Sequence, residues 1–304
     1  TASLGAVWSG CGQDYAPEGA AARLGQLRPR ALFTADGYRW NGKDVDKRAD
    51  SAALAGLLDE LKLHVVIGDP VTVAGAADGA PESAAVQRNW ATVVAGAETS
   101  DASPQAVPVA ADHPLWVLFS SGTTGRPKGI VHGHGGVLVE HLKAAGLHSG
   151  LGPGSVFFWQ TALSWMMWNF QVAGLLVGAR IVCYSGSPLY PDADTLWRIV
   201  AAEHVTYFGT SPGQLQACRK AGLHPGRDHD LSALTALGST GSTLPGDLFE
   251  WVHQAVDPEL AISSISGGTD VVSAFAGGSV GVPARPGELP VRYLGVALES
   301  WSPD

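Results

Sequence analysis

The sequence has few cysteines and no long apolar run. Its cysteines, Cys11, Cys183 and Cys218, are widely spaced and form no Cys-x-x-Cys pair, which argues against a disulfide framework and a zinc site. No uninterrupted apolar stretch reaches the roughly 18 residues of a membrane span, and the N-terminus has no signal-peptide pattern. These features predict a cytoplasmic protein with reduced thiols and no membrane partner, and they leave the oligomeric state open.

The sequence also lacks basic clusters. Only 15% of the 304 residues are charged, and the 19 lysines and arginines are scattered among 28 acidic residues, for a net charge of −9. This pattern argues against a nucleic-acid-binding groove, so an anionic ligand needs a local site. Hydrophobic residues make up 45% of the chain, which is enough to bury a large core in one large domain or two ordinary ones.

What the sequence does contain is a regular alternation of helical and strand patterns. Leucines at helical spacing over residues 54–61 precede an apolar strand at 64–67, and a strand at 115–119 precedes a glycine-rich loop and a helix over 136–147. Such alternation predicts an α/β fold with largely parallel sheets flanked by helices.

One region breaks this rhythm. Residues 71–113 are rich in Ala, Gly, Ser and Pro and show little periodicity, so we expect a loop-rich connection with one short helix near Trp90. We accordingly divide the chain into a first α/β part, residues 1–110, and a second α/β part, residues 111–304, that binds the ligands.

The glycine-rich loop predicts a phosphate site. Its glycines allow tight turns and close approach of the backbone to a ligand, and successive N–H groups in such a turn attract anions. Hydroxyl groups and two cations surround these glycines, which suits a polyphosphate. The loop is not a Walker motif, because Lys128 is followed by Gly129 rather than by Ser or Thr. The candidate residues are Ser120, Ser121, Gly122, Thr123, Thr124, Gly125, Arg126 and Lys128.

Taken whole, "FSSGTTGRPKGIVHGHGG" resembles the phosphate loop of the adenylate-forming enzymes, which include acyl-CoA synthetases, firefly-type luciferases and peptide-synthetase adenylation domains. Residues 1–38 resemble acetyl-CoA and acetoacetyl-CoA synthetases. The stretches "GTSPGQLQACRKAGLHPGRDHDLSALTALGSTGSTLP" and "ISGGTDVVSAF" resemble the acetoacetyl-CoA synthetases in particular. The resemblance implies the fold of the large N-terminal domain of these enzymes.

The resemblance also implies the nucleotide site. The loop from Ser120 to Lys128 would handle the β- and γ-phosphates of ATP, with Lys128 and Thr269 as catalytic residues and Asp270 as the ligand of Mg²⁺. Relatives usually have Glu at this last position, but Asp is also an oxygen ligand that suits Mg²⁺. The turn that packs against adenine corresponds to Gly241, Ser242 and Thr243.

The acyl pocket follows from the same resemblance. Its expected lining residues are Trp165, Met166, Thr240 and Gly267. Acetyl-specific relatives have a tryptophan at the position of Gly267, so a glycine there would leave room for the longer acetoacetate, although a larger acid would also fit. The pair His132 and His134 has no further ligand nearby, so we expect no metal there.

The implied reaction is ATP-dependent ligation of acetoacetate to coenzyme A through an acetoacetyl-adenylate, with ATP, acetoacetate and CoA as small-molecule partners. Two alternatives stay open: another short-chain acyl-CoA synthetase, and a truncated non-catalytic module that binds nucleotide or acyl groups. Relatives continue beyond the position of Asp304 into a ribose-binding aspartate, a hinge and a small C-terminal domain with a lysine. We therefore expect the chain alone to make acetoacetyl-CoA very slowly or not at all.

Overall fold

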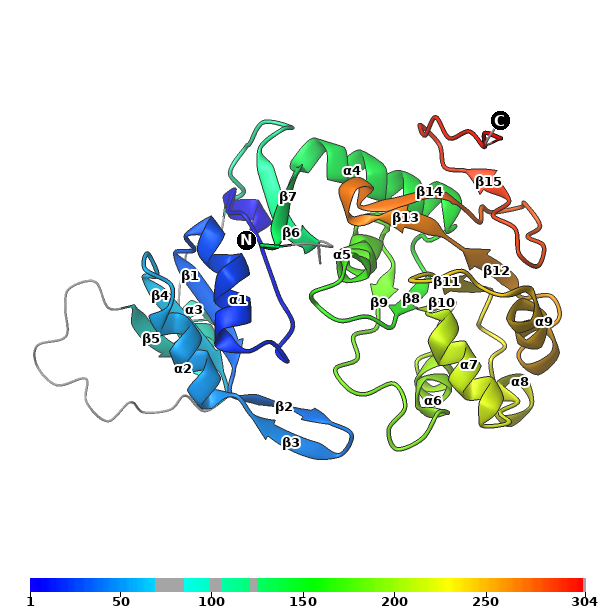
Figure 1. Cartoon of the computed structure of the whole chain (residues 1–304), viewed down its shortest axis with the longest axis horizontal. Helices are drawn as coiled ribbons and strands as arrows, with labels where there is room; N and C mark the ends of the chain where they lie inside the picture. The colour runs from blue at the N-terminus through cyan, green and yellow to red at the C-terminus, as the bar shows by residue number, and fades with distance from the viewer. Residues whose placement is uncertain (69–84, 99–104, 121–124, 303–304) are drawn as a thin grey trace, which may run out of the picture. The chain divides into compact units, whose positions relative to one another are not determined.

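The computed structural model describes residues 1–68, 85–98, 105–120 and 125–302. Contacts divide the chain into two units, Thr1–Gly133 and His134–Asp304. Each unit contains parallel strands together with helices (Figure 1), which confirms the predicted α/β class.

The first unit is built on three parallel strands in the order β1-β4-β5. Its core consists of side chains from α1, α2 and β1 and from the segment after α2: Ala20, Leu24, Leu32, Leu54, Leu58 and Leu61. Two antiparallel hairpins, β2–β3 and β6–β7, complete the described part of this unit. Its elements are η1 (Ala2–Leu4), α1 (Pro17–Leu24), η2 (Gly25–Leu27), β1 (Ala31–Ala35), β2 (Gly37–Trp40), β3 (Lys43–Asp46), α2 (Arg48–Gly56), β4 (Leu63–Ile67), β5 (Val86–Asn89), α3 (Trp90–Glu98), β6 (Pro114–Ser120) and β7 (Lys128–Gly133).

The boundary between these two units lies after β7. The reason is that β6 pairs with the start of the chain. The backbone N–H of Trp8 donates to the carbonyl of Leu115 at 3.0 Å, and the N–H of Val117 donates to the carbonyl of Trp8 at 2.9 Å. The β6–β7 hairpin therefore belongs with the N-terminal residues. The short helix expected near Trp90 is confirmed as α3, whereas strand β5 was not expected in the loop-rich region.

The second unit contains a five-stranded parallel sheet in the order β12-β11-β10-β8-β9. A smaller antiparallel sheet, β13-β14-β15, follows it along the chain. The elements are α4 (His134–Leu142), η3, a π-helix (Lys143–His148), β8 (Val156–Trp159), α5 (Met166–Ala173), η4 (Gly174–Val177), β9 (Arg180–Ile181), α6 (Thr195–Ala202), β10 (Tyr207–Thr210), α7 (Pro212–Lys220), α8 (Pro225–Asp228), β11 (Ala236–Ser239), α9 (Gly246–Ala255), β12 (Ala261–Ser264), β13 (Ser266–Gly268), η5 (Thr269–Val271), β14 (Ser273–Gly277) and β15 (Val291–Arg292).

Helices cover both faces of the five-stranded sheet. On one face, Phe158, Phe208 and Leu237 pack with buried residues of α6, α7 and α9. On the other face, Phe157 and Tyr207 pack with residues of η3, α5 and β14. Neighbouring residues of a strand face opposite sides of a sheet, so the apolar runs of β8 and β10 supply both cores.

The side chain of Trp159 explains why two positions of this sheet, Gly209 and Gly238, are glycines. Its buried indole lies across neighbouring strands, where a Cβ built on Gly209 would come within 2.1 Å of the ring and one on Gly238 within 2.7 Å. Neither position can carry a side chain unless the indole moves.

We expect Gly209→Ala to lower the free energy of unfolding by about 3 kcal/mol, because the added methyl group overpacks a closed core. Urea unfolding measures this loss. Gly213→Ala in α7 is the control, since its nearest neighbouring atom is 3.8 Å from the added Cβ and alanine favours a helix. Equal stabilities of the two variants would contradict this account of Trp159.

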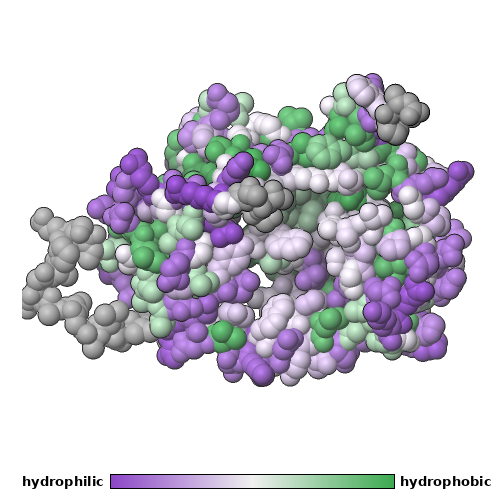
Figure 2. All heavy atoms as spheres, viewed as in Figure 1, coloured by the Kyte–Doolittle hydropathy of each residue, from purple (hydrophilic) through white to green (hydrophobic). Residues whose placement is uncertain are grey.

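Some apolar side chains of the second unit remain exposed. Leu138, Val139 and Leu142 of α4 are 40–68% exposed, and hydrophobic residues gather over this part of the molecule in Figure 2. Among the described residues, no helix is long and apolar enough to cross a membrane.

Candidate functional site

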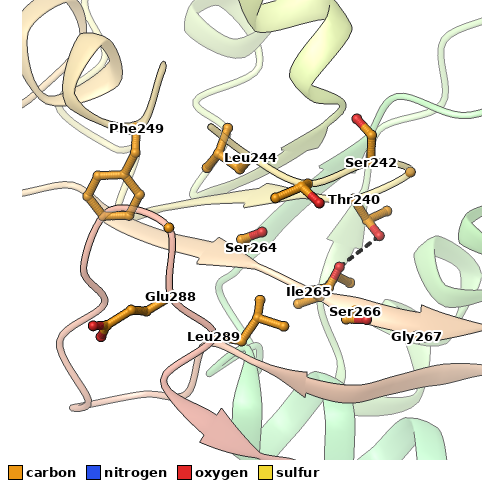
Figure 3. Close-up of a pocket in the computed structure, with 13 residues that line it drawn as sticks. Thr240, Ser242, Leu244, Phe249, Ser264, Ile265, Ser266, Gly267, Glu288 and Leu289 are labelled. Atoms are coloured by element: carbon orange, nitrogen blue, oxygen red, sulfur yellow. Dashed lines mark hydrogen bonds between the residues drawn. The ribbon is translucent and has the colours of Figure 1, made fainter. Parts of the chain in front are cut away.

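A cavity of about 450 Å³ lies in the second unit. Figure 3 shows its wall, in which segments after β11 and β12 and a later loop converge. Within it, the hydroxyl of Thr240 donates to the carbonyl of Ile265 at 3.1 Å, which ties two of these segments together. The lining residues are Thr240, Gly241, Ser242, Thr243, Leu244, Phe249, Ser264, Ile265, Ser266, Gly267, Gly287, Glu288 and Leu289.

The position of this cavity follows from the sheet. Strand β11 ends at Ser239 and β12 ends at Ser264, and these two residues are partners in the parallel register. The lining segments therefore start at the carboxyl ends of adjacent parallel strands, where open α/β sheets bind their ligands. Gly241 has φ +93°, a left-handed conformation that suits glycine, and no atom lies within 4 Å of a Cβ built there.

The cavity brings together five of the predicted site residues. Thr240, Gly241, Ser242 and Thr243 form one continuous segment of its wall, and Gly267 lies on another. The predicted adenine-binding turn, Gly241–Thr243, and two predicted acyl-pocket residues, Thr240 and Gly267, thus share one cavity. Their assignment to adenine and to the acyl group remains a prediction.

Gly267 occupies a crowded position. The pairing of β13 with β14 shifts register between Ser266 and Gly267, and a Cβ built on Gly267 would lie 1.9 Å from the carbonyl oxygen of Ser273. Glycine is therefore required here by the close approach of the two backbones. The glycine faces the cavity and also permits this bulged hairpin.

Thr269 and Asp270 form the turn that follows Gly267. They belong to the single 3₁₀ turn η5, which is followed by Val272 in a left-handed conformation with φ +50°. Asp270 is exposed and Thr269 is half-buried. The imidazole Nε2 of His141 donates to the carbonyl of Val272 at 2.8 Å, so helix α4 holds the end of this turn.

Two further predicted acyl-pocket residues, Trp165 and Met166, are placed differently with respect to the two described cavities. Met166 borders a second, much smaller space together with Phe170, Ser273 and Tyr293, and Ile265 borders both spaces. Trp165 precedes α5, is 61% exposed and lines neither cavity. Burial raises the pKa of Tyr293 well above its usual range, so its hydroxyl stays protonated at neutral pH.

The glycine-rich loop belongs to the first unit. It joins β6 to β7, with Ser120 directly opposite Lys128 in the antiparallel register. Gly125 has φ +93°. Arg126 and Lys128 are exposed, and neither forms an ion pair with a residue that the structure describes. The predicted phosphate-site residues Ser121, Gly122, Thr123 and Thr124 lie outside the described residues.

If Asp270 binds Mg²⁺ as predicted, most of the other ligands must come from outside the described side chains. Within the described ranges, no group of three or more His, Cys, Asp or Glu side chains is placed to hold a metal ion. Mg²⁺ is commonly held by one or two carboxylates together with phosphate oxygens and water. The exposed Asp270 carboxylate beside the Thr269 hydroxyl offers such hard oxygen donors.

Sequence reasoning missed several lining residues. Leu244 and Phe249 carry no polar signal, and both line the cavity while they belong to the apolar core on one face of the sheet. Glu288 and Leu289 come from a segment more than 40 residues after the turn at Thr243. The motif "SSISGG" was a usable signal, since two of its serines, Ser264 and Ser266, line the wall.

The model of the AMP-binding enzyme family matches residues 1–291. The acetoacetyl-coenzyme A synthetase of Rhizobium meliloti (strain 1021) is 40% identical over 303 residues, which are 99% of this chain and 45% of that protein. The malonamoyl-CoA synthetase of Penicillium aethiopicum is 35% identical over 322 residues, covering 100% of this chain and 44% of that protein.

Among solved structures, the acetoacetyl-CoA synthetase from Streptomyces lividans superposes with a TM-score of 0.89 at 47% identity. The match covers 100% of this chain and 45% of that one. The chain thus spans a little under half the length of the relatives it matches. Because the family model covers most of its residues, the chain belongs to the AMP-binding enzyme family.

Proposed function

We propose that this chain carries nucleotide- and acyl-binding residues of an ATP-dependent acetoacetate–CoA ligase. The observation that carries the proposal is the cavity at the carboxyl ends of β11 and β12, which joins the turn Thr240–Thr243 to Gly267. The acetoacetyl-CoA synthetases among its relatives support the choice of acid.

The proposed reaction has two steps. A carboxylate oxygen of acetoacetate attacks the α-phosphorus of ATP, which forms acetoacetyl-adenylate and expels pyrophosphate. The CoA thiolate then attacks the acyl carbon, the thioester forms, and AMP leaves with the electron pair of the broken C–O bond. Since the acid is ionised at pH 7, the first step needs no catalytic base, and positioning and charge stabilisation do most of the work.

The predicted site residues would supply different parts of this chemistry. In the first unit, the exposed cations Arg126 and Lys128 would neutralise charge on the phosphates. In the second unit, Gly241–Thr243 would pack against adenine, and Thr240, Gly267 and Met166 would shape the acyl site. Thr269 would contact phosphate, and Asp270 would hold Mg²⁺, which supplies further positive charge when bound.

The identity of the acid is the least constrained part of the proposal. The chain is similar at 35% identity to a protein named for malonamoyl-CoA, whose acid also carries a second carbonyl group. We favour acetoacetate because the more similar relatives are named for it, and another short-chain acid is the alternative.

The test is pyrophosphate release by the product of the whole reading frame that encodes this chain, with a panel of carboxylates. We expect kcat/KM for acetoacetate to exceed that for acetate by at least about tenfold, which corresponds to about 1.4 kcal/mol of differential binding. A higher kcat/KM for another short-chain acid would reassign the substrate and keep the reaction.

A non-catalytic binding module is the second candidate. It would bind ATP in a calorimeter and release no pyrophosphate with any acid of the panel, and that result would overturn the ligase. We further propose that the protein works in the cytoplasm, which is supported by three cysteines that are all unpaired.

A further inference from the structure

Two adjacent residues of helix α4 hold the hairpin that carries Thr269 and Asp270. His141 is 1% exposed, and its Nε2 donates to the carbonyl of Val272 at 2.8 Å. The hydroxyl of Ser273, the next residue, donates to the carboxylate of Glu140. Consecutive residues of the helix therefore bind consecutive residues of the chain directly after the turn.

The conformation that these contacts hold is an unfavourable one. Val272 has φ +50°, and a β-branched residue in the left-handed region is strained, so it persists only where its surroundings enforce it. Its N–H donates to the carbonyl of Thr269 at 3.4 Å, which closes the 3₁₀ turn. The direction of the Thr269–Asp270 segment thus depends on a residue that His141 keeps in place.

The helix is itself irregular at this point. Directly after Leu142 it continues as the π-helix η3, and π segments occur often at functional sites. Lys143, the first π residue, donates to Glu140 at 2.8 Å and to the carbonyl of Leu294 at 2.9 Å. The Glu140 carboxylate is therefore fixed from both sides, by Lys143 and by Ser273.

We propose that His141 is a positioning residue for magnesium-dependent nucleotide binding, and that Glu140 supports it. His141 acts through the backbone of Val272: it sets the turn on which Thr269 and Asp270 stand. This inference rests on the proposed function, since it assigns a role toward Mg²⁺ and ATP.

The test compares His141→Leu, which removes the donor, with His141→Gln, whose side-chain amide can donate to the same carbonyl. Calorimetry of ATP binding without any acid, at increasing Mg²⁺ concentration, gives a readout that needs no turnover. We expect His141→Leu to raise the Mg²⁺ concentration for half-maximal ATP binding by about tenfold, as expected for a lost buried hydrogen bond. His141→Gln should restore it to within about threefold of the unchanged protein.

Thr195→Val is the matched control, because the buried Thr195 hydroxyl lies 2.9 Å from the carbonyls of Tyr190 and Asp192, at the start of α6. It should lose stability without any change in the Mg²⁺ requirement. If His141→Leu and the unchanged protein needed the same Mg²⁺ concentration, the role of His141 would be overturned. The proposed function would not be affected by that result.

If His141→Leu does not fold, Ser273→Ala decides the question, since it releases the Glu140 carboxylate. We expect that variant to raise the Mg²⁺ requirement by about threefold, and an unchanged value would count against the inference. If the unchanged protein bound no magnesium–ATP at all, the proposed function would fail, and the role of His141 with it.

Discussion

Lys128→Gln is expected to slow adenylate formation by roughly a hundred- to a thousandfold. Loss of a single preorganised group that stabilises transition-state charge costs on the order of 3 kcal/mol, and Lys128 is an exposed cation that forms no ion pair with a described residue. Single-turnover release of pyrophosphate measures the effect. Because the lysine would act mainly on charge that develops as pyrophosphate leaves, kcat should fall more than the KM for ATP rises.

Lys43→Gln provides the control for this experiment. Lys43 is likewise an exposed lysine of the first unit at the start of a strand, so its replacement changes the net charge equally. We expect the Lys43 variant to release pyrophosphate at the rate of the unchanged protein. Equal rates for the Lys128 variant and the unchanged protein would refute the phosphate role of the loop.

Gly267→Ala is expected to destabilise the second unit by about 3 kcal/mol, because overpacking against a fixed backbone is costly. The added Cβ would stand 1.9 Å from the Ser273 carbonyl oxygen, so the β13–β14 hairpin must open to accept it. Since the Thr269–Asp270 turn lies between these strands, activity should fall with acetate as well as with acetoacetate. Thermal unfolding and the carboxylate panel test both effects.

The neighbouring glycine offers a control one residue away. At Gly268, the closest atoms to an added methyl group would be 4.0 Å distant, and its φ of −163° is an extended conformation that alanine also adopts. We expect Gly268→Ala to change the free energy of unfolding by less than about 0.5 kcal/mol. Gly267→Ala could instead keep full activity with acetate and lose activity only with acetoacetate. In that case the added methyl group would act by filling the acyl pocket, and the explanation from backbone crowding would be wrong.

The sequence predicted those parts of the fold in which apolar residues follow the spacing of a strand or a helix. The strands β4, β8 and β10 are apolar runs between helical patterns, and the class follows from their alternation. Strand β5, with the sequence Val-Gln-Arg-Asn, has no apolar alternation, because pairing with β4 rather than burial defines it. The π-helix η3 was also hidden, since its sequence has the periodicity of an ordinary helix end.

The site was predictable only in part. The resemblance to the adenylate-forming enzymes implied that Thr240–Thr243 belong to the site, and these four residues line one cavity. The crowding at Gly267 could not be read from the sequence, since it arises from the register of β13 against β14. Trp165 shows the opposite case: the resemblance placed it in the acyl pocket, but its side chain is exposed and lines neither of the two cavities.

The π-helix has a consequence for comparing related chains. A π turn holds one more residue than an α turn, so it corresponds to a single-residue insertion within a helix. In a homologue with one residue fewer between Leu142 and Ser149, the upstream part of the helix would be rotated by about 100° relative to the downstream part. A one-residue gap at this place in an alignment would therefore indicate homologues in which other side chains of this helix contact the β13–β14 hairpin.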